Sequence, residues 1–467
     1  MNSHALLYVV VIPIAWLAIR PLRTERPRQM LLLFASYLLY SSWGVGFLGL
    51  LVLSSLMNYF FARLLNARQS AARLWIGIIA NVALLALFKY VPELLPLLGD
   101  TRLGPVINHI VLPIGMSFWT FQGMSSLFDS YRGEQLKPSL VEFLLYMAFW
   151  PTVLSGPICR LPGLLPQFRS TKNSGRRDVE KGMDRICTGL FMVALGVVLA
   201  NGLHGQGVDH GFQVSPKGLS GPDVWCLAFG YGFELFFNFA GYSHIVIGAA
   251  RLFGFELDEN FNGPYFSTTP SEFWTRWHMS LSFWIRDYLF LPLVMLNRSK
   301  VWRNATLVIS MLTFGIWHEG TALLALWGLY HGILLVLHRQ WQELKRRLGW
   351  RFSGRLPSLL SWTVTISVMC LGWIFFRSTD LKQAMAMLHS VIEISSYSTI
   401  TLAPSLFLLV AALAAGYFVV LRLIRVGTVR LRGIQIPVEM RMVLYSVAIY
   451  LGVLHTAQTQ AFAYFKF

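Results

Sequence analysis

The chain has 467 residues, of which 55% are hydrophobic and only 13% are charged. Soluble domains carry about 25% charged residues, so the composition excludes an ordinary soluble protein and predicts an all-α chain that crosses a membrane many times. The net charge of +17 resides in basic clusters between apolar stretches. Such clusters are typical of the cytoplasmic flanks of membrane spans and do not indicate a nucleic-acid partner.

The N-terminal stretches predict spans that alternate in direction. Residues 5–20 form a first span, and the arginine cluster at 20–28 places the N-terminus outside. Residues 30–61 are too long for one span and are basic at both ends, so we expect the chain to turn near Gly44. Residues 74–91 then run outward, and residues 106–128 return.

A re-entrant segment is predicted at residues 139–158. The stretch is apolar, has basic residues on both sides, and is broken by Pro151 and Gly156. Non-helical backbone at membrane depth persists only where protein or a watery cavity surrounds it. The segment therefore indicates a cavity, and a basic cytoplasmic loop is expected after it, at residues 160–185.

The second half of the chain predicts further spans around one polar stretch, residues 254–300, which is too polar for a lipid-facing span. The final span leaves the C-terminus outside, and the total is about 10 to 12 spans. The expected helices are 186–203, 222–250, a hairpin of 304–317 and 320–338, and then 358–376, 402–424 and 440–457.

The hairpin carries two histidines, in FGIWHEG at residues 314–320 and LWGLYHG at residues 326–332. From Arg303 to His318 a helix rises about 22 Å, less than the roughly 30 Å hydrocarbon core, so His318 is expected at membrane depth. A neutral imidazole there can take a proton from a hydroxyl nucleophile. The alternative is a histidine hydrogen-bonded between helices. We favour function for His318, and for His331 both interpretations stay open.

A second candidate segment reads FWTRWHMSLSFWIRDY at residues 273–288. On one helix, Trp277, Leu281 and Trp284 would share a face, and Arg276 would align with Asp287 three turns away. One interpretation is the lining of a polar cavity whose arginine and histidine side chains meet an acyl donor. The other is an interfacial amphipathic helix with snorkelling arginines.

Polar residues also interrupt the apolar run FFNFAGYSH at residues 236–244. Asn238, Tyr242 and Ser243 are the residues concerned, and hydrogen bonds between helices are the commoner explanation for them. The chain has no GxSxG, HExxH or P-loop motif, which leaves hydrolase, zinc-protease and NTPase interpretations without support. Its four cysteines form no CxxC pair, so no metal site is predicted.

These segments resemble the membrane-bound O-acyltransferase family, on the side of its bacterial polysaccharide O-acetyltransferases. The resemblance covers nearly the whole chain. It rests on LPIGMSF (112–118) with YRG (131–133), SGPI (155–158), residues 236–267, 273–292 and 315–332, LGWIFFR (371–377) and FAYFKF (462–467).

The resemblance implies a ring of tilted helices around a funnel, a catalytic His318 and a second functional histidine, His278. Three departures stand out. Asn238 and His244 occupy positions where the family pattern has Asp, and Glu319 stands where it has Gly, which puts a carboxylate beside His318 to orient it.

The sequence thus predicts a single membrane domain over residues 1–467, with N-terminal helices (1–110), a catalytic core (about 111–380) and C-terminal helices (381–467). The expected activity is O-acetylation of an exported polysaccharide, with acetyl-CoA as a donor substrate and no permanently bound cofactor. Arg276 and Arg286 would bind the donor. The supporting residues are His331, Glu319, Trp317, Arg276, Asp287, Asn238, Tyr242 and Ser243.

The expected location is the bacterial inner membrane, with both termini periplasmic. The expected partners are the lipid bilayer, a periplasmic acetyltransferase subunit of the SGNH-hydrolase type, and the polysaccharide synthase complex. Two alternatives stay open. One is D-alanyl transfer to teichoic acid from a carrier protein. The other is a polysaccharide transporter without chemistry, which predicts intramembrane charge pairs and internal repeats.

Overall fold

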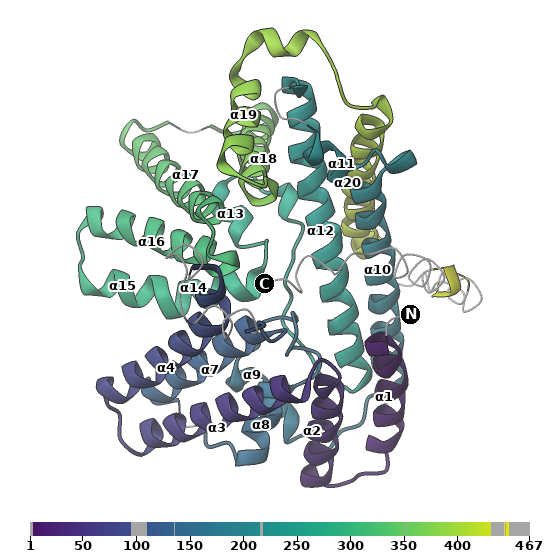
Figure 1. Cartoon of the computed structure of the whole chain (residues 1–467), viewed down its shortest axis with the longest axis vertical. Helices are drawn as coiled ribbons and strands as arrows, with labels where there is room; N and C mark the ends of the chain where they lie inside the picture. Colours follow the sequence, from purple (N-terminus) through teal and green to yellow (C-terminus); the bar gives the residue numbers. More distant parts are fainter. Residues whose placement is uncertain are drawn as a thin grey trace. The chain divides into compact units, whose positions relative to one another are not determined.

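The described part of the chain folds entirely into helices and their connections (Figure 1). The computed structural model describes residues 3–94, 110–134, 136–214, 218–350, 352–430, 443 and 445–447. Helices satisfy every backbone hydrogen bond within one segment, as a bilayer demands. Seven described helices are long and apolar enough to cross a membrane, which confirms an all-α polytopic protein: Val45–Ala67, Ala71–Lys89, Arg176–Gly205, Met279–Leu296, Ala322–Arg347, Arg355–Arg377 and Pro404–Leu423.

Contacts divide the chain into two units. Unit 1 comprises residues 1–186, 243–259 and 456–467, and unit 2 comprises residues 187–242 and 260–455. Within the described residues, the chain passes from one unit to the other inside two long helices, α10 (Arg176–Asn201) and α12 (Gly221–Leu252), and again between Glu259 and Asn260.

In unit 1, α7 packs against α3, α4 and α8, and its residues are buried along almost the whole helix. The predicted turn near Gly44 is confirmed, because Gly44 adopts φ +148° between α2 and α3. Asn58 and Asn81 exchange hydrogen bonds of 3.0 and 2.8 Å and tie α3 to α4. Besides the start of α10 and the end of α12, its described helices are α1 (Ser3–Ile19), α2 (Glu25–Ser41), α3 (Val45–Ala67), α4 (Ala71–Lys89), α5 (Val91–Leu94), α7 (Met116–Tyr131), α8 (Leu140–Ala148) and α9 (Leu161–Phe168).

The segment predicted as re-entrant begins with α8, whose nine residues rise only about 14 Å. Irregular backbone follows, and residues 149–159 are all buried. Gly115, at φ +78°, lies so close to this backbone that a Cβ would stand 2.0 Å from the Val153 carbonyl oxygen. The predicted loop at 160–185 is wrong in part, because α9 forms within it and α10 begins at Arg176.

Unit 2 contains the expected hairpin, formed by α16 and α17, which pack along each other and appear as adjacent green helices in Figure 1. Besides parts of α10 and α12, its helices of four or more residues in the described part are α11 (Val208–Gln213), α13 (Pro270–Trp274), α14 (Met279–Ile285), the π-helical η5 (Arg286–Phe290), α15 (Leu291–Leu296), α16 (Lys300–Glu319), α17 (Ala322–Arg347), α18 (Arg355–Arg377), α19 (Leu381–Ile392), η6 (Ile394–Ser398) and α20 (Pro404–Arg430).

Several predicted boundaries in unit 2 are wrong. The polar stretch 254–300 contains a continuous helical run, residues 279–296, that is apolar enough to cross a membrane. The helix expected over 273–288 is broken between α13 and α14. The short helix α19 was not predicted, and α20 continues to Arg430.

Some predictions fall outside the described residues. They concern the two termini, most of residues 92–105 between the stretches 74–91 and 106–128, almost all of the span at 440–457, and the motif at 462–467. The division into one domain, the number of spans and their arrangement as a ring stay predictions.

Candidate functional site

The α16–α17 hairpin buries both of its central histidines. His318 is 2% exposed and His331 is fully buried. The turn between the helices follows from local sequence, because Gly320 adopts the left-handed conformation at φ +77° and Thr321 caps α17 by accepting from the Leu324 N–H. His318 therefore occupies the last turn of α16, at the closed end of the hairpin.

Four aromatic rings surround His318 and are called here the His318 cage. Their ring centroids lie 4.9 to 5.4 Å from that of the imidazole. Two belong to α16, one to α17 and one to the end of α18, so three helices are needed to build the cage. Its members are Phe314, Trp317, Trp327 and Phe376.

His331 shares the indole of Trp327 with His318. The His331 ring lies 5.0 Å from Trp327 and 5.2 Å from Trp274. Neither of its nitrogens has a hydrogen-bond partner among the described residues. Gly372 of α18 makes room for the ring, since a Cβ there would stand 2.4 Å from His331 Nε2.

His278 sits at a backbone break and not within a helix. It adopts a left-handed conformation, with φ +43° and ψ +53°, and precedes the first residue of α14. Its side chain is fully buried, and the Phe239 ring lies 4.7 Å away at a right angle. The neighbouring Met279 N–H donates to the Asn260 carbonyl oxygen at 2.9 Å, which fixes the break against the preceding loop.

The break separates residues that the helical interpretation had aligned. Arg276 pairs with Glu272 at 2.7 Å, whereas Arg286 pairs with Asp287 at 2.6 Å. The predicted alignment of Arg276 with Asp287 is therefore wrong. The prediction that Trp277 shares a helical face with Leu281 and Trp284 is also wrong, because Trp277 precedes α14. Its ring lies 4.9 Å from that of Trp373.

The polar residues of α12 lie at its packing surfaces. Asn238 is half-buried and meets Gly196 of α10 so closely that a Cβ on the glycine would stand 2.2 Å from Asn238 Oδ1. Ser243 is 2% exposed, while Tyr242 and His244 are half-buried. Glu319, next to His318, is half-buried too.

Sequence reasoning missed Glu234, a glutamate inside the apolar part of α12. It is 8% exposed, and Arg377 and Asp209 are the charges that act on it. The signal was present, because an ionisable residue in an apolar helix is a functional candidate wherever it occurs.

Two hollows are lined by charged groups. One, of about 530 Å³, lies at the open end of the hairpin and is lined by five cations and one carboxylate: Lys300, Arg303, Arg339, Glu343, Arg346 and Arg347. We call it the basic hollow. Within the described residues, no three His, Cys, Asp or Glu side chains are grouped as a metal ion requires.

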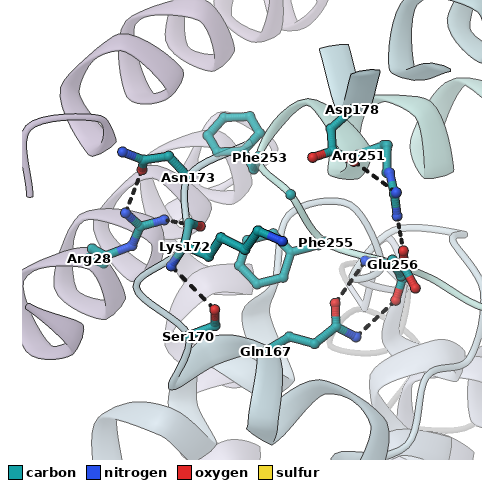
Figure 2. Close-up of a pocket in the computed structure, with 11 residues that line it drawn as sticks. Arg28, Gln167, Ser170, Lys172, Asn173, Asp178, Arg251, Phe253, Phe255 and Glu256 are labelled. Carbon is teal, nitrogen blue, oxygen red and sulfur yellow. Dashed lines mark hydrogen bonds and ion pairs between the residues drawn. The ribbon is translucent and has the colours of Figure 1, made fainter. Parts of the chain in front are cut away.

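The other hollow, of about 380 Å³, belongs to unit 1 (Figure 2). Figure 2 shows that its arginines are already engaged: Arg28 donates to Asn173 Oδ1 at 2.7 Å, and Arg251 pairs with Asp178 and Glu256. The carboxylates of Asp178 and Glu256 offset positive charge here, whereas the amide of Asn173 is neutral.

His278, His318 and His331 lie within the part of the chain that matches a known protein family. The model of the membrane-bound O-acyltransferase family, MBOAT, matches residues 37–378. The chain is 33% identical over 384 residues to "Probable alginate O-acetylase AlgI" of Pseudomonas aeruginosa, which covers 80% of this chain and 71% of that protein. It is 32% identical over 407 residues to "Peptidoglycan O-acetyltransferase" of Helicobacter pylori, with coverages of 79% and 75%. It is 27% identical over 300 residues to "Teichoic acid D-alanyltransferase" of Bacillus subtilis, with coverages of 62% and 74%.

Proposed function

Because this chain belongs to the membrane-bound O-acyltransferase family, we propose that it moves an acetyl group from cytoplasmic acetyl-CoA to a hydroxyl on the far side of the bacterial inner membrane. Acyltransferase activity and a multi-pass membrane location follow from the family and its O-acetyltransferase relatives. The proposal of acetyl transfer from acetyl-CoA to a hydroxyl rests on one observation, the burial of His318 within the His318 cage.

His318 acts as the general base in this proposal. Its imidazole takes the proton of the acceptor hydroxyl while the oxygen attacks the thioester carbonyl carbon. The C–S bond then breaks, and the thiolate leaves with the proton that His318 had accepted. The His318 cage limits the access of water, which otherwise competes as an acceptor.

Further residues support the reaction in this proposal. Trp317 and Glu319 flank His318 in sequence and restrict the orientation of its ring, and His331 packs against the same Trp327 ring as His318. His278, buried at its backbone break, orients the acyl carbonyl. Asn238, Tyr242 and Ser243 keep α12 in place as a wall of the site.

The basic hollow supports an anionic donor. It lies near the start of α16, and the fifteen-residue rise from Arg303 to His318 is about 22 Å. A donor with phosphates at one end and a thioester at the end of a long arm matches that separation. Arg276 and Arg286 are further donor contacts in this proposal, reached by exchanging their carboxylate partners for phosphate.

The acceptor is an exported polysaccharide, reached directly or through a periplasmic acetyltransferase subunit of the SGNH-hydrolase type that works beside the synthase complex. The names of the Pseudomonas and Helicobacter relatives support a cell-envelope polysaccharide. We also propose that both termini are periplasmic.

D-alanyl transfer to teichoic acid is the second candidate. The likeness to the Bacillus protein favours it, and the basic hollow would then dock an acidic carrier protein. A labelled D-alanyl carrier tested beside labelled acetyl-CoA separates the two donors.

The test is transfer of label from acetyl-CoA by the purified protein in lipid nanodiscs. We expect His318→Ala to abolish transfer, while His389→Ala, a change at an exposed histidine, leaves it unchanged. Full activity in His318→Ala refutes the assignment. If the wild-type protein neither transfers an acyl group from a thioester nor hydrolyses one, the result supports the alternative of a polysaccharide transporter without chemistry.

A further inference from the structure

A three-residue charged cluster lies beside the His318 cage and takes no part in the mechanism above. Arg377, the last residue of α18, donates from Nη2 to Asp209 Oδ1 of α11 at 2.6 Å, and its guanidinium lies over the Phe212 ring. Glu234 of α12 lies within electrostatic range of both charges. We call these residues, Asp209, Glu234 and Arg377, the acidic cluster, because they combine two carboxyl groups with one guanidinium.

The acidic cluster adjoins His318 through two aromatic side chains. Phe376, next to Arg377 in sequence, has its ring 5.1 Å from that of His318. Tyr231, about one turn before Glu234 on α12, has its ring 6.5 Å from Phe376. The two helices are close here, since a Cβ on Gly232 would stand 2.9 Å from Trp373 of α18. All of these residues belong to unit 2.

Glu234 is the incomplete member of the acidic cluster. Its Oε2 accepts no hydrogen bond from the described residues, although the residue is only 8% exposed. A buried carboxyl oxygen without a hydrogen-bond partner is costly, and Arg377 already donates to Asp209. The open position on Oε2 is where a bound molecule can donate a hydrogen bond.

Exposure decreases along the cluster, from Asp209 through Arg377 to the buried Glu234. The Asp209 side chain is 43% exposed and that of Arg377 is 29% exposed. A ligand entering here meets first a carboxylate, then a guanidinium, and then the buried Glu234 beside the His318 cage. Adjacent hydroxyl groups suit this series, because each can both donate to a carboxylate and accept from a guanidinium.

We propose that Asp209, Arg377 and Glu234 bind the acceptor, and that this acceptor is a saccharide whose neighbouring hydroxyls hydrogen-bond to the cluster while one of them faces His318. This inference rests on the proposed function. It adds the residues that bind the acceptor and the choice of a directly bound saccharide over a partner protein. Glu234 is a positioning residue in it, since the proton of the reacting hydroxyl goes to His318. A single serine hydroxyl of a partner protein would engage only one member of the cluster.

The experiment compares acceptor transfer with thioester hydrolysis in nanodiscs, using labelled acetyl-CoA and the neutral oligosaccharide cellotetraose. We expect Glu234→Leu to raise the KM for cellotetraose about tenfold, the effect of one lost charge-assisted hydrogen bond. Hydrolysis of acetyl-CoA by water should stay within about twofold, because the donor and His318 are untouched. Glu234→Gln should keep the KM within about threefold, since the amide still donates and accepts.

Glu393→Leu, at an exposed glutamate of the same unit, is the matched control and should change neither quantity. An unchanged KM in Glu234→Leu overturns the inference. So does a parallel loss of hydrolysis and transfer in both Glu234 variants, which points to a structural role. Transfer that depends on Glu234 with a serine peptide but never with cellotetraose overturns the saccharide class. Failure of the proposed function looks different, because the wild type would then transfer to neither acceptor.

Discussion

At the residue scale, the imidazoles of His318 and His331 share one neighbour, the indole of Trp327. The sequence indicated both histidines, because charged or titratable groups are rare in apolar helices. It could not indicate which rings would surround them, since Phe376 and Trp274 come from segments far away in the chain. Glu234 was detectable by the same rule and was passed over because it lies just outside the polar run that begins at Asn238.

Gly372→Ala tests how tightly the His331 ring is held. The new Cβ would stand 2.4 Å from His331 Nε2, so the ring or α18 must move. We expect destabilisation of about 1 to 3 kcal/mol, which is typical of overpacking. The measurement is thermal unfolding of the purified protein. Gly416→Ala, where a Cβ meets nothing within 4 Å, should be neutral or stabilising, and equal effects of the two changes would contradict the packing.

Comparing His278→Gly with His278→Ala separates two contributions of residue 278, the strain of its left-handed backbone and the function of its imidazole. A left-handed conformation costs an ordinary residue about 1 kcal/mol or more and costs glycine little. His278→Gly should therefore unfold at a higher temperature than His278→Ala, while both variants lose acetyl transfer. Equal melting temperatures would show that the strain at φ +43° is absent.

At the scale of elements, the sequence predicted the helices wherever hydrophobic length and turn residues agreed. Gly44 and Gly320 mark the turns that join α2 to α3 and α16 to α17. The break at His278 escaped prediction because histidine has no intrinsic preference for a left-handed backbone. The hydrogen bond from Met279 to Asn260, which helps to hold the break, joins positions nineteen residues apart.

Close approach of α16 and α17 depends on glycines that touch no histidine. A Cβ on Gly328 would stand 2.3 Å from the Met311 carbonyl oxygen. Gly328→Ala should push the helices apart, lower the melting temperature and reduce acetyl transfer at least about tenfold, as small misplacements of reacting groups do. Gly416→Ala again serves as the control. Normal transfer in Gly328→Ala would show that hairpin spacing does not set the site geometry.

Glu142, near the start of α8, provides a test of how the stability of the fold depends on pH. The helix α8 is not among those long and apolar enough to cross a membrane. Burial raises the pKa of the Glu142 carboxyl, but hydrogen bonds from Arg169 and Ser139 outweigh burial and hold the pKa below its ordinary value of 4.5. The unfolded chain thus binds this proton more readily, so the pair stabilises the fold at neutral pH and ceases to do so as pH falls through the lowered pKa.

Melting temperatures measured from pH 7 to pH 3 check this contribution. Below about pH 4.5 the wild type should lose stability more steeply than Glu142→Gln, which cannot titrate there. Glu393→Gln, at an exposed position, should follow the wild type. Parallel curves for wild type and Glu142→Gln would contradict the role assigned to the pair.

At the scale of the whole molecule, composition alone predicted the membrane class, and the family match agrees with it. The direction of transfer is a property of the whole chain as well. It requires a donor entry on the cytoplasmic side, an acceptor entry on the other, and His318 accessible from both. The basic hollow and the acidic cluster are our candidates for these entries.

Sealed inverted inner-membrane vesicles test that central claim most directly. Labelled acetyl-CoA is added outside, at the cytoplasmic face, and cellotetraose is enclosed in the lumen. The wild type should place label on the enclosed sugar, and His318→Ala, present at the same level, should place none. Equal luminal labelling by the two proteins would contradict the account.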